Sequence, residues 1–134
     1  MEQNPYQSPQ TAVPGAASVY TKPSMKELLF SFTGRVPRRV FWGVSLISAL
    51  VFSVIAGIAM AIDPTFGMIV VIAMYIPLIW ISLAVSIKRW HDRGKSGWWI
   101  FIGLIPFVGG IWAFVECGCL RGTIGDNVYG AEPT

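Results

Sequence analysis

One short stretch carries most of the residues that could do chemistry, Lys88 to Trp99, which reads K-R-W-H-D-R-G-K-S-G-W-W. It includes the only histidine, His91, followed directly by the carboxylate of Asp92. A histidine oriented by a carboxylate can serve as a general base, but adjacent residues rarely face one another and no nucleophile accompanies this pair. We therefore assign no catalytic residue, and we interpret His91, Asp92 and Ser96 as residues that organise the loop.

The same stretch invites two further interpretations, a phosphate-binding loop and a metal site. Gly94-Lys95-Ser96 matches the end of a phosphate-binding loop, but that motif needs a glycine five residues before Gly94, where Arg89 stands. His91 lacks further metal ligands on the same side, and the two cysteines, Cys117 and Cys119, are too few to build a site. The sequence therefore predicts no metal ion and no cofactor.

The composition around this stretch is that of a membrane protein. The chain has 134 residues, enough for one domain, of which 54% are apolar and 13% charged. Soluble domains carry about 25% charged residues. A net charge of +3 without a basic stripe on a soluble fold argues against a nucleic-acid partner.

Two polar tails are expected to flank a membrane domain over residues 24–120. Residues 1–23 contain four prolines and three glutamines and no apolar run, which predicts a disordered polar tail. Residues 121–134 form the C-terminal tail. Ser24-Met25-Lys26-Glu27 has the pattern of a capping box, so we expect a short amphipathic helix over about 24–34 in the plane of the lipid headgroups.

Three apolar stretches follow, over residues 40–62, 68–87 and 98–120. The first has 23 residues without a charge, about 35 Å as a helix, and a hydrocarbon core is about 30 Å thick. The third contains Pro106, Gly109 and Gly110, so it fits either a kinked spanning helix or a re-entrant hairpin. Our prediction takes the kinked helix, which gives an all-α integral membrane bundle of three transmembrane helices.

Small residues mark two helix faces on which another helix could pack closely. Residues four apart lie on one face of a helix, and small side chains let two helices approach in a membrane. The first face belongs to the stretch 40–62 and the second to the stretch 98–120; their members are Ser45, Ala49, Ser53, Gly57 and Ala61, and Gly109 and Ala113. The pattern leaves open whether the contact lies within one chain or between two.

The lysines and arginines predict the orientation in the membrane. Five precede the first span, none stands in the first turn, four stand in the central loop and one follows the third span. The N-terminus and residues 88–97 are therefore expected in the cytoplasm. Three spans place the C-terminus outside, whereas a hairpin returns it to the cytoplasm.

Seven of these basic residues are expected to form one cytoplasmic rim beside several tryptophans. A cationic rim of this kind attracts anionic lipid headgroups. We predict that it binds anionic lipid or a protein partner through Arg35, Arg38, Arg39, Lys88, Arg89, Arg93 and Lys95.

Four ordered motifs resemble the bacterial domain-of-unknown-function family 805, the YhaH-like small inner-membrane proteins. They are Phe32-Thr33-Gly34-Arg35 with Arg38 and Phe41-Trp42, the stretch Lys88 to Trp99, Ile105 to Gly109, and Gly122 to Gly130. The resemblance covers about residues 28–134 and departs at Val40, where the family often has an acid, and at Val128, where it often has Arg. It implies a bacterial inner membrane, and it supplies no established activity or catalytic residue.

The function we predict is that of a non-enzymatic inner-membrane protein whose rim binds lipid or a partner. Its partners would be membrane lipids, with a second copy of the chain or another membrane protein as alternatives. A second hypothesis is a small transporter or channel component, in which Pro77, Pro106 and Glu116 supply the irregular backbone and the charge of a pathway. A third is a membrane-embedded enzyme that uses His91 and Asp92.

Overall fold

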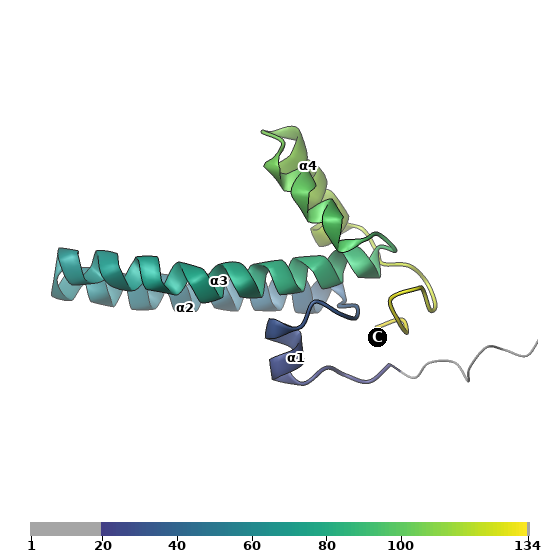
Figure 1. The fold of residues 1–134 in the computed structure, drawn as a ribbon, viewed down its shortest axis with the longest axis horizontal. Coiled ribbons are helices and arrows are strands. Elements are labelled where there is room, and N and C mark those ends of the chain that lie inside the picture. The colour runs from purple at the N-terminus through teal and green to yellow at the C-terminus, as the bar shows by residue number, and fades with distance from the viewer. Residues whose placement is uncertain (1–19, 134) are drawn as a thin grey trace, which may run out of the picture.

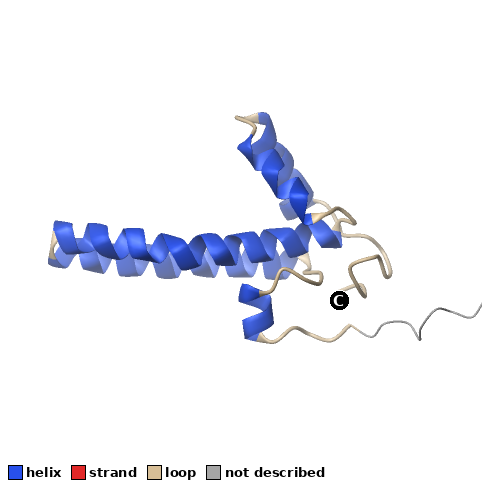
Figure 2. Cartoon of the chain, viewed as in Figure 1, coloured by secondary structure: helices blue, strands red, loops and turns tan. Residues whose placement is uncertain are grey.

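The computed structural model describes residues 20–133, and the elements named in this range are all helical. The disordered tail predicted for residues 1–23 therefore lies almost wholly outside the described residues. In chain order the elements are α1 Met25–Phe30, α2 Arg38–Ile62, α3 Pro64–Asp92, the 3₁₀ helix η1 Gly97–Leu104, α4 Val108–Ala113 and the π-helical η2 Phe114–Cys119. Helices α2 and α3 form a long antiparallel pair, and the shorter elements gather at one end of it (Figures 1 and 2). We call this end, where α2 begins and α3 ends, the basal end.

Helix α1 begins with the predicted capping box. The Glu27 amide donates to Ser24 Oγ at 3.3 Å, and the Ser24 amide donates to Glu27 Oε2 at 2.9 Å. These two bonds satisfy amides that the first turn of a helix leaves without partners. The helix ends at Phe30, four residues earlier than predicted, and Gly34 beyond it takes a φ of +94°.

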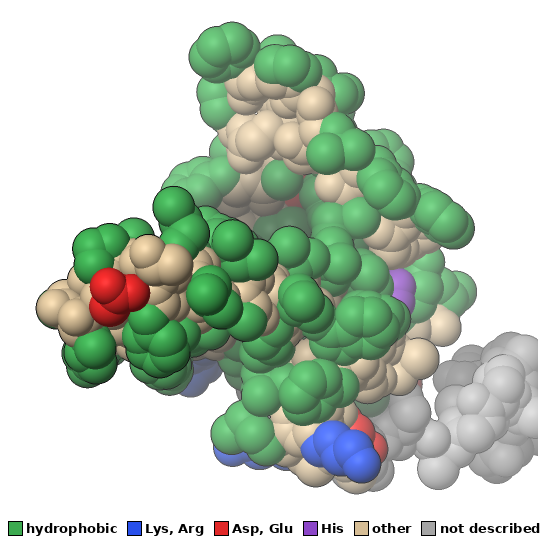
Figure 3. All heavy atoms as spheres, turned by 60° about the vertical axis from the view of Figure 1, so that its left-hand side comes forward, with side chains coloured by type: hydrophobic (Ala, Val, Ile, Leu, Met, Phe, Trp, Pro, Cys, Tyr) green, Lys and Arg blue, Asp and Glu red, His purple; other side chains and the backbone are tan. Residues whose placement is uncertain are grey.

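Helices α2 and α3 are long and apolar enough to cross a membrane. They have 25 and 29 residues, and an 18-residue stretch of each has a mean hydropathy of 2.4 and 2.5, which confirms two of the predicted apolar helices. The turn between them is tight because Asp63 accepts the Phe66 amide at 2.8 Å and Pro64 occupies the first helical position. Hydrophobic side chains cover the outer surface of the pair (Figure 3). Asp63 stands at the far end, in the turn between the two helices.

The third apolar stretch is not one helix, and this corrects the kinked span predicted over 98–120. The chain runs outward as η1, reverses around Pro106 and returns as α4 and η2 (Figure 1). Pro106 cannot donate a backbone hydrogen bond, and Phe107 adopts a φ of 62°, so the helix cannot continue through this turn. The result has the shape of the hairpin alternative, and we call residues 97–119 the apolar hairpin.

The hairpin also changes where the C-terminal tail lies. One continuous span would carry residue 120 to the end of the molecule opposite Lys88. In the structure the Leu120 carbonyl accepts from Arg89 at the basal end of α3, and the Cys119 carbonyl accepts from Arg38 Nη1 at 2.6 Å. Residues 120–133 therefore share the basal end with the start of α2. The external C-terminus predicted from three spans does not follow from this arrangement.

The two faces of small residues have different surroundings. Ser45, Ala49, Ser53, Gly57 and Ala61 are all exposed, and a Cβ added at Gly57 would meet no atom within 4 Å. Helix α3 therefore does not pack on Gly57, and a contact between copies stays a prediction. The second face packs inside the hairpin, because a Cβ at Gly109 would lie 2.8 Å from the Ile102 carbonyl carbon of η1.

Candidate functional site

A buried ion cluster joins distant parts of the chain at the basal end. Asp92, in the last turn of α3, accepts from Arg89 one turn earlier and from Arg35 Nε at 3.1 Å, 57 residues away in sequence. The Arg35 Nη2 lies 2.9 Å from the same Asp92 oxygen. Arg89, Asp92 and Arg35 are 0%, 3% and 4% exposed. We call these three residues the basal cluster.

The remaining donors of the two guanidinium groups hold the C-terminal segment in place. Arg89 Nε donates to the Cys117 carbonyl at 2.6 Å, and Arg89 Nη2 donates to Leu120. Arg35 donates to the carbonyls of three residues of this segment, Thr123 at 2.6 Å, Gly125 at 2.8 Å and Gly130 at 3.2 Å. Buried charges need partners of this kind, so the cluster can exist only when the tail is docked.

His91 connects three segments without facing Asp92. Its Nδ1 donates to the Gly34 carbonyl at 3.1 Å, and its ring stacks on Tyr129 with centroids 4.0 Å apart. Asn127 Nδ2 donates to the His91 carbonyl at 2.9 Å. Ser96 Oγ accepts the Trp98 amide at 3.3 Å at the start of η1. These contacts have the geometry expected of residues that organise a loop.

Replacing His91 by Gln should therefore have a small effect. We expect the free energy of unfolding to fall by about 1 kcal/mol, because the stacking on Tyr129 is lost while an amide can still donate to Gly34. Thermal unfolding in mild detergent measures this change. Tyr129→Leu, which removes the same stacked pair from the other side, should give a similar loss. A His91→Gln variant that melts normally but loses a cellular phenotype would contradict the organising role.

Three further basic residues of the predicted rim also bind inside the chain. Lys88 is 2% exposed and donates to the carbonyls of Glu27 and of Leu28, the latter at 2.7 Å, so it caps the C-terminal end of α1. Arg93 and Lys95 each donate to Glu116 at 2.8 Å. The sequence analysis named Glu116 only as a charge of a possible pathway and did not identify it as their partner.

Only part of the predicted rim is therefore open to the outside. Arg38 and Arg39 are exposed, and the Arg39 side chain makes no hydrogen bond or ion pair to any other residue in the range 20–133. Other exposed basic side chains accompany them at the basal end: Lys22, Lys26 and Arg121. Arg121 pairs with Glu132 at 3.3 Å, and the Gly125 amide followed by Arg121 holds the pKa of Glu132 below its usual range.

The C-terminal segment supplies functional residues that sequence reasoning left without a role. Gly122 lies against Asp92 so closely that any Cβ there would overlap the carboxylate, and the Thr123 amide donates to the Asp92 carbonyl at 2.6 Å. Asn127 and Tyr129 hold His91. The signal was present in the motif from Gly122 to Gly130, but no spacing rule connects it to Asp92.

The contacts of Asp92 and His91 suit a structural role better than a catalytic one. Both Asp92 oxygens accept from arginines, and the His91 nitrogen nearest the backbone is engaged by Gly34. Among residues 20–133, no group of three or more His, Cys, Asp or Glu side chains could hold a metal ion. Cys117 is buried and Cys119 exposed, and both are free thiols.

The fold and the basal cluster define a class of protein: a small helical membrane protein whose long apolar helices meet a polar, ion-paired end. Comparison with known proteins identifies the family. Residues 29–131 match the family described as Protein of unknown function (DUF805), and the chain belongs to it. This match confirms the resemblance carried by the four motifs.

Three relatives from Escherichia coli strain K12 show the extent of the similarity. Inner membrane protein YhaI is 34% identical over 105 residues, which cover 76% of this chain and 85% of the relative. Inner membrane protein YhaH is 30% identical over 106 residues, covering 76% and 86%. Uncharacterized protein YiiR is 29% identical over 136 residues, covering 81% and 90%. No solved structure matches the chain. The chain is thus one of a family of integral inner-membrane proteins.

Proposed function

We propose that this protein is a non-enzymatic membrane protein that docks its basal end on anionic lipid headgroups. The observation that carries the proposal is the shared position of two surfaces. The apolar hairpin exposes large side chains, with Trp98 at 77%, Leu104 at 76% and Phe107 at 89%. The hairpin begins and ends at the basal end, where exposed Arg38 and Arg39 lie. Apolar side chains beside exposed cations suit the boundary between acyl chains and anionic headgroups.

The two other functions considered fit the geometry less well. A pathway through the membrane would need polar groups well inside the spans, yet Glu116 pairs with Arg93 and Lys95 at the basal end, and Pro77 is exposed on α3. An enzyme that uses His91 and Asp92 would have to break the ion pairs of Asp92 first. Both considerations favour lipid docking.

The proposal includes an orientation with both ends of the described chain in the cytoplasm. The basal end carries all ten basic residues if Lys22 is counted with α1 and Arg121 with the tail, and the far turn carries none. Positive residues favour the cytoplasmic side. Helices α2 and α3 would span the bilayer, and the apolar hairpin would enter the cytoplasmic leaflet only.

The orientation predicts the behaviour of reporters fused after Thr134. A fluorescent protein there should be bright and a phosphatase inactive, because both would remain in the cytoplasm. The same reporters inserted after Asp63, in the turn between α2 and α3, should behave in the opposite way. An active phosphatase after Thr134 would restore the three-span topology and contradict the hairpin.

Lipid docking predicts a charge-dependent affinity. Each exposed cation near an anionic surface contributes about 1 kcal/mol, reduced by salt. Replacing Arg38 and Arg39 together by Gln should weaken the interaction of the purified protein with phosphatidylglycerol, measured by exchange from detergent into vesicles, up to about thirtyfold at low salt. The matched control is Ser45→Ala with Ser53→Ala on the exposed face of α2, which should change nothing. Equal affinity of the double arginine variant and the unmodified protein at low salt would rule out docking through these residues.

A further inference from the structure

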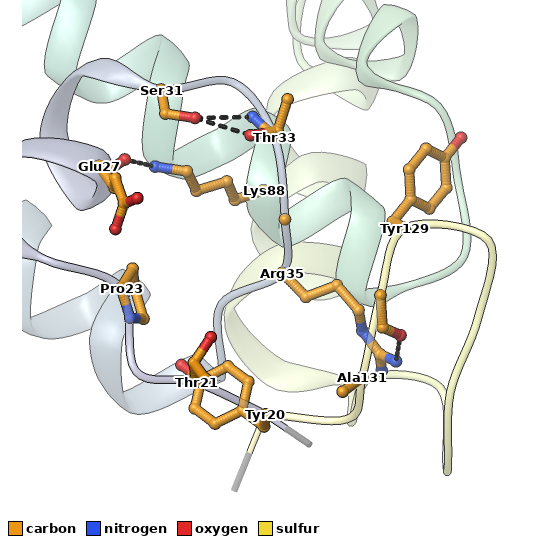
Figure 4. A pocket seen from close by; sticks show the side chains of 12 residues that line it. Tyr20, Thr21, Pro23, Glu27, Ser31, Thr33, Arg35, Lys88, Tyr129 and Ala131 are labelled. Carbon is orange, nitrogen blue, oxygen red and sulfur yellow. Dashed lines mark hydrogen bonds between the residues drawn. The ribbon is translucent and has the colours of Figure 1, made fainter. Parts of the chain in front are cut away.

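A pocket lined in part by charged and hydroxyl side chains lies at the basal end between the N-terminal and C-terminal segments. Its volume is about 280 Å³, and its walls come from the segment before α1, the loop between α1 and α2, the end of α3 and the C-terminal segment. Figure 4 shows Lys88 and Arg35 on its walls together with the hydroxyl groups of Ser31, Thr33 and Tyr129. It is separate from the exposed arginines Arg38 and Arg39, which do not line it.

The charges around this pocket do not balance within the described chain. Lys88, Arg35 and Arg89 are each at most 4% exposed, and the carboxylate buried with them is Asp92 alone. Glu27 also lines the pocket and interacts electrostatically with Lys88, but it is exposed and its carboxylate is engaged by Ser24. Three cations therefore stand against two carboxylates. Carbonyl groups satisfy the N–H donors of the three cations without neutralising their charge. Buried charges without counter-charges are costly, so an anion in the pocket would stabilise this end of the protein.

The pocket also offers hydrogen-bond donors suited to such an anion. A lysine ammonium has three donors, and within residues 20–133 two of those of Lys88 are used, by the carbonyls of Glu27 and Leu28. The hydroxyls of Ser31 and Thr33 lie 2.8 Å apart and share one hydrogen bond, which leaves a second donor for a ligand. Arg35 has its donors engaged and would act through its charge.

We propose that this pocket binds one phosphate group, with Lys88 and the Ser31–Thr33 pair as donors and Arg35 as a nearby positive charge. A phosphate presents several strong acceptor oxygens and a negative charge, which match both properties of the pocket. The headgroup of an anionic phospholipid and a free phosphate present the same chemistry. The inference goes beyond surface docking, because it requires one ligand per chain and uses cations that are buried.

The test measures stoichiometric binding to the full chain in neutral detergent. Calorimetry with inorganic phosphate and, separately, with short-chain phosphatidylglycerol should show one site per chain for at least one of the two probes. Ser31→Ala combined with Thr33→Val should weaken that binding at least tenfold while the protein melts normally. Lys88→Gln should abolish it; if that variant does not fold, the Ser31→Ala and Thr33→Val variant carries the test alone.

The two probes distinguish a lipid headgroup from free phosphate as the ligand. The arginine variant distinguishes binding in the pocket from docking of the basal end on a lipid surface. Binding of phosphatidylglycerol alone identifies a lipid headgroup as the source, and binding of inorganic phosphate as well identifies free phosphate. Arg38→Gln with Arg39→Gln should leave this stoichiometric binding unchanged even where it weakens vesicle binding. Absence of binding by both probes, or equal binding by the Ser31→Ala and Thr33→Val variant, overturns the pocket.

Discussion

Replacing Asp92 by Asn is expected to lower the free energy of unfolding by about 3–5 kcal/mol. The substitution keeps the size of the side chain but removes the one buried carboxylate between Arg35 and Arg89, both at most 4% exposed. Removing one partner of a buried ion pair leaves an uncompensated charge, which is far more costly than the loss of an exposed pair. The C-terminal segment should detach with the cluster, because Arg35 and Arg89 hold its carbonyls.

Thermal unfolding in mild detergent measures the effect, and limited proteolysis of residues 120–133 measures the detachment. The matched control is Asp63→Asn at the other end of α3, where Asn also caps a helix and the residue is exposed, so its effect should stay within about 0.5 kcal/mol. Equal melting of the two variants would mean that the basal cluster does not hold the tail.

The parts of the fold that the sequence predicted follow from patterns that lie within a single stretch of the chain. Helices α2 and α3 follow from two long apolar stretches separated by Asp63-Pro64, and α1 follows from the capping box at Ser24 and Glu27. The third stretch was long enough to span, but length cannot distinguish one helix from two short arms. Whether this stretch forms one helix or two short arms depends on the turn at Pro106 and Phe107 and on the close approach of Gly109 to η1.

The basal cluster could be predicted only in part, because charge counts do not show which charges are buried. Lys88, Arg89 and Arg35 counted toward an exposed rim, yet carbonyls of α1 and of residues 117–130 surround them in the structure. Those carbonyls belong to backbone far away in sequence, and no residue type marks them. We interpreted His91 and Asp92 as residues that organise the loop because no nucleophile accompanies them in the sequence. The contacts of His91 with Gly34 and Tyr129 show which segments of the chain His91 connects.

The last prediction concerns the apolar hairpin, where Gly109→Ala should destabilise the protein by about 3 kcal/mol. A Cβ at this position would overlap the Ile102 carbonyl oxygen and lie 3.0 Å from the Ile105 Cβ. The overlapping atoms are backbone, so a rotamer change cannot relieve the clash and the two arms of the hairpin must separate. Overpacking of this kind costs about 1–3 kcal/mol, and a backbone obstacle places the cost at the upper end.

The neighbouring glycine provides the control. A Cβ at Gly110 would meet no atom within 4 Å, and alanine favours helix more than glycine does, so Gly110→Ala should leave the melting temperature unchanged or raise it slightly. A cysteine placed at Leu104, which is 76% exposed near the turn, would report on the hairpin through its labelling rate in lipid vesicles once the exposed Cys119 is replaced by Ser. Gly109→Ala should change that rate because the arms move, and Gly110→Ala should not. If both alanine variants melt alike, residues 98–120 do not fold back as a hairpin, and the single kinked span becomes the better description of this stretch.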